Sequence, residues 1–222
     1  MGKIILEAND LYKSYANGTS KLNVLRNFTL KVNKGDMITI IGESGCGKST
    51  ALNILSTLDQ PDKGNVKIDS SDISTLSDIA LSKLRNQKIG FIFQSHYLLP
   101  EFTALENALM PAWIAKKDNK KNAVENIFEY LGIIKRKNHY PSQLSGGEKA
   151  RVCLTRAIIN KPLILFADEP TGNLDKKNSE KLVSLFQKIN SDFNQTIILT
   201  THNEQVADFG HKKLKLENGV LN

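Results

Sequence analysis

Eight consecutive residues, 42–49, have the types and spacing of a phosphate-binding loop. They match Gly-x-x-x-x-Gly-Lys-Ser/Thr between the apolar run 37–41 and a helical pattern, which is the context that this motif requires. Glycines let the backbone curl so that its amides point at phosphate oxygens, and the following helix adds the positive end of its dipole. We expect Lys48 to reach the β- and γ-phosphates of ATP and Ser49 to bind Mg²⁺. The residues expected to contact ATP here are Gly42, Glu43, Ser44, Gly45, Cys46, Gly47, Lys48, Ser49 and Thr50.

Two adjacent carboxylates end the apolar run 163–167. Acids at the carboxyl end of a buried parallel strand face the crevice in which such sheets bind ligands. Asp168 is predicted to hold Mg²⁺, through water, and Glu169 to orient and deprotonate an attacking water. The alternative is a solvated acidic turn that caps the next element. Beside a phosphate loop, the pair indicates hydrolysis of ATP.

The pentapeptide Leu144-Ser145-Gly146-Gly147-Glu148 carries a second signal. Ser145 can cap a helix, with Glu148 three residues on completing a capping box. The segment could therefore be only a helix start. A cap does not need two glycines, however, and the pair suits close approach of the backbone to a ligand.

Alternating β-rich and helical patterns must position these residues. Runs of continuous apolar residues suit parallel strands that are buried on both faces. Helical spacing extends from Lys48 toward Leu58 and over 177–189, and the stretch 103–137 has helical spacing with Pro111 near a helix break. The tail around Asn218-Gly219 reads as a hairpin. The expected strands are 4–6, 28–32, 37–41, 89–93, 163–167 and 196–200.

This order of elements predicts one α/β nucleotide-binding domain over 1–222. Its core comprises 1–94 and 159–222, and a helical subdomain, 95–158, is inserted between them. A chain of 222 residues with 40% hydrophobic residues can bury such a core.

Composition restricts the partners. No apolar run approaches the roughly 18 residues that cross a bilayer, so we expect a soluble, cytoplasmic protein that meets a membrane only through a partner. The net charge of +7 is interpreted as a solvated surface. Its clusters, at 116–121 and 135–137, have no interleaved aromatic residues, and no nucleic acid is expected. The two cysteines are expected to be reduced, and Cys46, among amides that favour anions, could react with alkylating reagents unless ATP covers it.

With these motifs in this order, the chain resembles the ATPase subunits of ATP-binding-cassette (ABC) transporters over essentially its whole length. The resemblance implies a P-loop NTPase (RecA-like) core with an N-terminal antiparallel β portion and the helical subdomain. It also implies roles for four residues. Tyr15 would stack on adenine, and Gln94 would sense Mg²⁺ and the γ-phosphate and couple to the transport partner. Asp175 would communicate across a dimer, and His202 would contact the γ-phosphate.

In such ATPases the pentapeptide acts in trans. The resemblance therefore implies a head-to-tail dimer of two copies with two ATP molecules at the interface, in which 144–148 completes the partner's site. It further implies integral membrane permease subunits and a peripheral location on the cytoplasmic side of the inner membrane.

A narrower resemblance rests on 98–107 and 171–175. These segments are similar to the ATPase of the bacterial lipoprotein-releasing system. The alternatives are a regulatory subunit of a cell-division complex and the ATPase of a macrolide-type or antimicrobial-peptide exporter. A soluble cassette protein of translation or DNA repair is a third class, but those usually carry two cassettes per chain.

Overall fold

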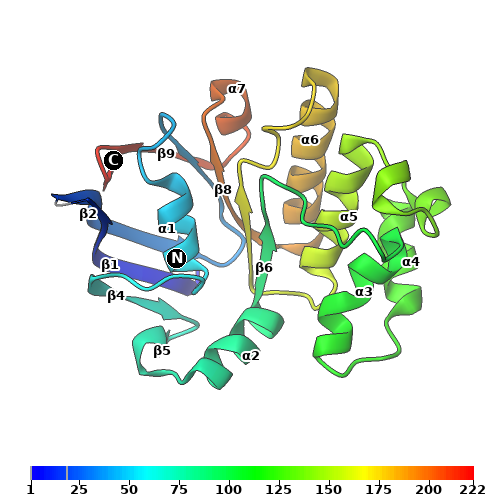
Figure 1. Cartoon of the computed structure of the whole chain (residues 1–222), viewed down its shortest axis with the longest axis horizontal. Coiled ribbons are helices and arrows are strands. Elements are labelled where there is room, and N and C mark those ends of the chain that lie inside the picture. Colours follow the sequence, from blue (N-terminus) through cyan, green and yellow to red (C-terminus); the bar gives the residue numbers. More distant parts are fainter. Residues whose placement is uncertain (1, 19) are drawn as a thin grey trace.

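The computed structural model describes residues 2–18 and 20–222. Two sheets and a group of helices make up the fold (Figure 1). The smaller sheet is antiparallel, with strand order β2-β1-β4-β5. Its strands are β1 (Ile4–Asn17), β2 (Ser20–Asn33), β4 (Lys63–Ile68) and β5 (Ser71–Asp72). This is the expected N-terminal antiparallel portion, with β1 and β2 much longer than the short runs recognised in the sequence.

The larger sheet positions the site. Its order is β10-β9-β3-β8-β7-β6, and every neighbouring pair except β9 and β10 is parallel. Along β8, Ile197 and Leu199 face one apolar cluster and Ile198 faces the other, because successive side chains of a strand point to opposite faces. The strands are β3 (Met37–Ile41), β6 (Ile89–Ile92), β7 (Ile164–Asp168), β8 (Thr196–Thr201), β9 (Lys212–Glu217) and β10 (Val220–Leu221).

Helices cover both faces of this sheet. On one face α1 lies between the two sheets, and its buried residues join the cluster that includes β1 and β2. On the other face α5 and α6 pack, while α3 and α4 extend the molecule away from the antiparallel sheet (Figure 1). The α-helices are α1 (Lys48–Leu55), α2 (Asp78–Lys88), α3 (Ala104–Ile114), α4 (Lys121–Tyr130), α5 (Gly146–Ile158), α6 (Lys176–Phe193) and α7 (Glu204–Ala207).

Pro111 stands near a helix break, as the sequence suggested, but not at the break itself. It lies inside α3, which continues to Ile114. A proline in the last turn costs only one intrahelical hydrogen bond, here to the carbonyl of Asn107. The carbonyl of Pro111 accepts hydrogen bonds from the amides of Asn86 (3.0 Å) and Asn160 (2.9 Å), which fasten this end of α3 to the core.

The predicted hairpin at the tail is confirmed. Asn218 and Gly219 connect β9 to β10 with φ angles of 49° and 81°. Two successive left-handed residues are what a two-residue turn with the twist of a hairpin requires.

Candidate active site

The phosphate loop connects β3 to α1, as predicted. Gly45 and Gly47 take φ angles of 81° and 107°, a region that side chains disfavour. Lys48 is only 5% exposed, and its ammonium donates to the carbonyls of Gly42 (2.8 Å) and Glu43 (2.9 Å). The ammonium is therefore held against the carbonyls at the start of the phosphate loop.

Glu169 lies between two of the other predicted residues. Its Oε1 is 3.3 Å from Lys48 Nζ, and its Oε2 is hydrogen-bonded to His202 Nδ1. The residue directly follows β7 and adopts a left-handed φ of 45°. Such a backbone conformation costs a non-glycine residue about 1 kcal/mol or more, and it recurs at functional sites. It is held here by the Glu169 amide, which donates to the Thr200 carbonyl at 3.1 Å.

Asp168, at the end of β7, has a different environment. Its Oδ1 accepts a hydrogen bond from Thr200 Oγ1 at 2.7 Å, so the neighbouring strand orients this carboxylate. Asp168 does not line the pocket described next, in which Glu169 takes part. Adjacent carboxylates thus point to different surroundings.

A pocket of about 630 Å³ brings the distant motifs together. Its lining draws on the antiparallel sheet, the phosphate loop and the ends of β6, β7 and β8. Val24, in β2, is the one lining residue that the sequence did not single out, because a valine in a strand carries no motif. The lining residues are Tyr15, Val24, Ser44, Gly45, Gly47, Lys48, Ser49, Thr50, Gln94, Glu169 and His202.

The segment after β6 is tied to two other elements. The Asn173 side-chain amide donates to the Gln94 carbonyl at 3.0 Å. Two residues further on, Arg156 of α5 donates to the carbonyls of His96 (2.8 Å) and Tyr97 (2.7 Å). Sequence reasoning missed Asn173 and Arg156, since both act through backbone carbonyls of a distant segment.

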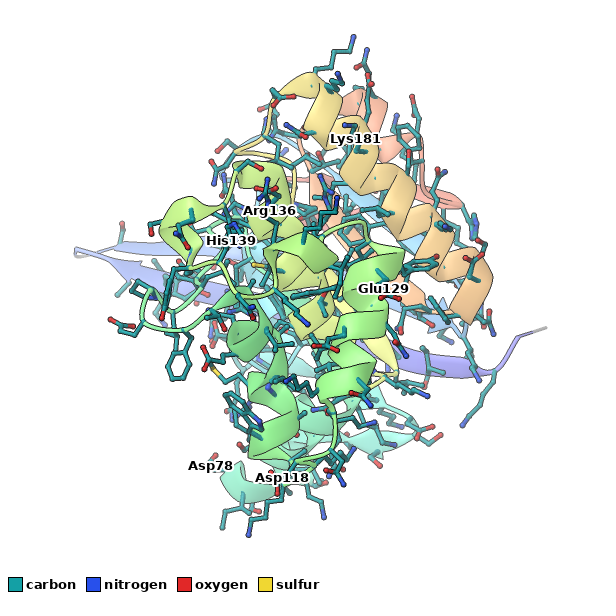
Figure 2. All side chains as sticks on the ribbon, turned by 90° about the vertical axis from the view of Figure 1, so that its right-hand side faces the viewer. Asp78, Asp118, Glu129, Arg136, His139 and Lys181 are labelled. Carbon is teal, nitrogen blue, oxygen red and sulfur yellow. The ribbon has the colours of Figure 1, made fainter. Side chains whose placement is uncertain are left out.

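The pentapeptide 144–148 starts α5 and does not line the pocket of its own chain. Ser145 is the N-cap, and the predicted capping box with Glu148 is present. A hydrogen bond from Arg136 Nε (2.7 Å) is the main reason that the pKa of Glu148 falls to about 2. Figure 2 shows Arg136 beside His139, on the surface next to the start of this helix.

The two glycines of the pentapeptide also have a packing role. A Cβ atom on Gly146 would lie 3.2 Å from Leu174, and one on Gly147 would lie 3.0 Å from Asn178. Asn178 in turn donates through its backbone (2.9 Å) and side-chain (2.6 Å) amides to Asp175, the N-cap of α6. The predicted signature and Asp175 are therefore in contact through Asn178 within one chain.

Cys46, in the phosphate loop, does not line the pocket that contains Lys48. Its thiol packs against the apolar cluster beneath the loop, and it lines a separate pocket with Leu216 of β9. A Cβ atom on Gly42 would lie 2.6 Å from the sulfur. The thiol is therefore not part of the lining of the Lys48 pocket, and its shielding by ATP stays a prediction.

We expect alkylation of Cys46 by N-ethylmaleimide to inactivate the protein, because the added group must displace the loop. Saturating ATP should slow the labelling, as measured by mass spectrometry, because bound phosphates would fix the loop that carries the thiol. Cys153 serves as an internal control. Burial raises the pKa of its thiol to about 11, so we expect no labelling of Cys153. If Cys46→Ser were inactivated at the same rate, this assignment would be wrong.

Comparisons with known proteins decide the family. A family model described as "ABC transporter" matches residues 25–172, more than half of the chain. The chain belongs to the ABC transporter family. The lipoprotein-releasing system ATP-binding protein LolD of Cytophaga hutchinsonii is 49% identical over 98% of this chain and 98% of its own. The LolD protein of Legionella pneumophila (strain Paris) is 43% identical over 100% and 98% of the two chains.

Solved structures agree in fold. A dimeric structure of the bacterial ABC transporter cassette MJ0796 superposes with a TM-score of 0.90 at 36% identity, covering 98% of this chain and 97% of that one. A dimeric post-hydrolysis state of the same cassette, bound to ADP and Pi, gives 0.87 with the same coverage. The α/β P-loop NTPase fold and the nucleotide-binding character of the domain are confirmed.

Proposed function

We propose that this chain is the ATP-hydrolysing subunit of an ABC transporter that releases lipoproteins from the inner membrane. The full-length 49% identity to a LolD protein is the observation that carries the proposal. The fit of the pocket to a nucleoside triphosphate supports it, since its lining combines an exposed aromatic ring, a phosphate loop and a carboxylate.

Hydrolysis follows from the arrangement around Glu169. The loop amides and Lys48 would bind the β- and γ-phosphates of ATP, and Glu169 would take a proton from the water that attacks the γ-phosphorus. His202, hydrogen-bonded to the same carboxylate, would orient it and contact the γ-phosphate. Gln94, which also lines the pocket, would hold the attacking water in line.

The oxygen donors near the phosphate loop suit Mg²⁺. A serine hydroxyl, an amide oxygen and a carboxylate are hard ligands, and Mg²⁺ in such sites is held by few protein groups together with substrate phosphates. Within residues 2–18 and 20–222 there is no group of three or more His, Cys, Asp or Glu that could hold a metal ion by itself. Ser49 and Gln94 would bind the ion directly and Asp168 through water, and its charge would offset that of the phosphates.

A second copy of the chain is part of this proposal. The helix that begins after Ser145 offers free backbone amides, yet 144–148 lies outside its own chain's pocket. Amides at a helix N-terminus bind phosphate oxygens. A head-to-tail dimer would place this helix start on the partner's ATP, and the solved relatives with the same fold are dimeric. Asp175 would then lie near the dimer interface and report the state of one site to the other.

Exposed apolar side chains mark a surface for the permease subunits. Tyr97, Leu99, Trp113 and Ile114 lie between Gln94 and the end of α3 and are 67%, 41%, 37% and 68% exposed. Contiguous patches of exposed apolar side chains are typical of interaction sites, and these four residues would contribute to such a patch. We propose that 95–158 moves as a helical subdomain and transmits the state of Gln94 to an integral membrane partner.

Among the described residues no helix is long and apolar enough to cross a membrane. We propose a peripheral location on the cytoplasmic side of the inner membrane, beside the permease subunits, and expect no nucleic acid to be involved.

Replacement of the native ATPase tests the lipoprotein assignment. A bacterial strain depleted of its lipoprotein-releasing ATPase would express this chain together with the permease subunits that are native to this chain. We expect lipoproteins to reach the outer membrane again, as measured by membrane fractionation, and the Glu169→Gln variant to leave them in the inner membrane. If lipoproteins stayed in the inner membrane while this chain restored septation to a division-defective strain, the regulatory alternative would replace the proposal.

A further inference from the structure

A carboxylate outside every sequence motif, that of Asp59, contacts Tyr15, which is the residue expected to stack on adenine. Asp59 Oδ2 accepts a hydrogen bond from the Tyr15 hydroxyl at 2.8 Å. Its Oδ1 accepts one from Lys13 Nζ at 2.8 Å. The same ammonium lies 5.2 Å from the centroid of the Tyr15 ring, within the range of a cation–π contact. The ring is therefore held at its hydroxyl and on one face.

Lys13 and Asp59 contact Tyr15 from outside the pocket that contains the phosphate loop. Tyr15 lines the pocket that contains the phosphate loop, whereas neither Lys13 nor Asp59 does. Lys13 instead lines a separate pocket together with Asp62. The two residues can thus fix the tyrosine without touching a ligand in front of it.

Asp59 is also fastened to the helix that carries the phosphate loop. Its backbone amide donates to the carbonyl of Asn53 at 3.1 Å, and Asn53 lies in α1, which begins at Lys48. Tyr15, by contrast, lies on β1 in the antiparallel sheet. The carboxylate therefore bridges the sheet that bears the aromatic ring and the helix that follows the phosphate loop.

The protonation states of Asp59 and Tyr15 favour the hydrogen bond between them. Partial burial acts to raise the pKa of Asp59, but the hydrogen bonds from Lys13 and Tyr15 outweigh it and hold this pKa below its usual value. Burial and the Asp59 carboxylate raise the pKa of Tyr15. At neutral pH the carboxylate is charged and the phenol keeps its proton, so a charge-assisted hydrogen bond joins them.

We propose that Asp59 is a positioning residue for the nucleotide base: it fixes the Tyr15 ring at a set distance from the phosphate loop and thereby contributes to the affinity for ATP. Lys13 acts with it by holding the other carboxylate oxygen. The inference rests on the proposed function, because it takes ATP as the ligand of the pocket.

Comparison of ATP with inorganic tripolyphosphate tests the role, because tripolyphosphate has no base to stack. In Asp59→Ala we expect the Kd for ATP to rise about fivefold, the effect of losing roughly one net hydrogen bond. The values of kcat and of the Kd for Mg²⁺-tripolyphosphate should stay within about twofold of wild type. Asp62→Ala is the matched control: Asp62 binds the amide and hydroxyl of Ser14 (2.8 and 2.7 Å) and not Tyr15, so ATP affinity should be unchanged.

A double-mutant cycle separates positioning from a general structural effect. Tyr15→Phe keeps the ring and loses the hydroxyl, so adding Asp59→Ala to it should weaken ATP binding by less than about twofold. The inference is overturned if tripolyphosphate binding weakens as much as ATP binding, or if Asp59→Ala has its full effect in the Tyr15→Phe background. A wild-type chain that did not bind ATP would contradict the proposed function instead.

Discussion

Glu169→Gln is expected to lower kcat for ATP hydrolysis by about a thousandfold, which is the usual loss when a general base is removed. The amide cannot accept the proton of the attacking water. Its oxygen can still accept a hydrogen bond from Lys48 or His202, both of which contact the carboxylate. ATP affinity should therefore be preserved within a few fold. Because hydrolysis is what reopens the proposed dimer, the variant should accumulate as an ATP-bound dimer in light-scattering measurements.

Glu204→Gln provides the matched control. Glu204 starts α7, is exposed, and pairs with Lys213 at the surface, outside the residues that line the pocket. Its removal should leave both kcat and the oligomeric state unchanged. A Glu169→Gln variant that hydrolysed ATP at the wild-type rate would exclude Glu169 as the base. A monomeric wild-type protein with full turnover would refute the shared site.

Lys48→Ala is expected to weaken ATP binding by about two orders of magnitude, the effect of losing one or two charge-assisted hydrogen bonds to phosphate. The buried ammonium also holds the carbonyls of Gly42 and Glu43, so the loop should become looser. Equilibrium titration with a fluorescent ATP analogue measures the affinity. Circular dichroism would show that the fold persists.

Lys215→Ala removes the same charge on the other side of the loop. Lys215 lines the pocket that faces Cys46 and is not part of the ATP pocket. We expect its affinity for ATP to match that of wild type. If ATP affinity fell equally in both variants, Lys48 would contribute only to the overall positive electrostatic potential. Residues 42–50 would then not be the phosphate-binding loop.

The elements that the sequence predicted best are those with one dominant signal. The continuous apolar runs gave β3, β7 and β8 to within a residue or two, because strands buried on both faces have almost no polar positions. Residues 63–88 yielded no prediction, although β4, β5 and α2 form there. Only Val66 and Ile68 of β4 and Leu81 of α2 are buried, so the apolar pattern is too sparse to reveal a period.

By itself, the sequence determined which residues can do chemistry. A phosphate loop, an acidic pair after a buried strand and a glycine-rich helix start depend on local backbone geometry, which a few neighbouring residues specify. Tertiary structure alone decided which of them meet. It brought Lys48, Gln94, Glu169 and His202 to one pocket, because the parallel strands that precede them end at the same edge of their sheet, and it added Tyr15 from the antiparallel sheet. It also kept 144–148 out of that pocket and placed the Asp59 carboxylate against the Tyr15 hydroxyl. Such contacts join residues more than forty positions apart, and no local pattern records them.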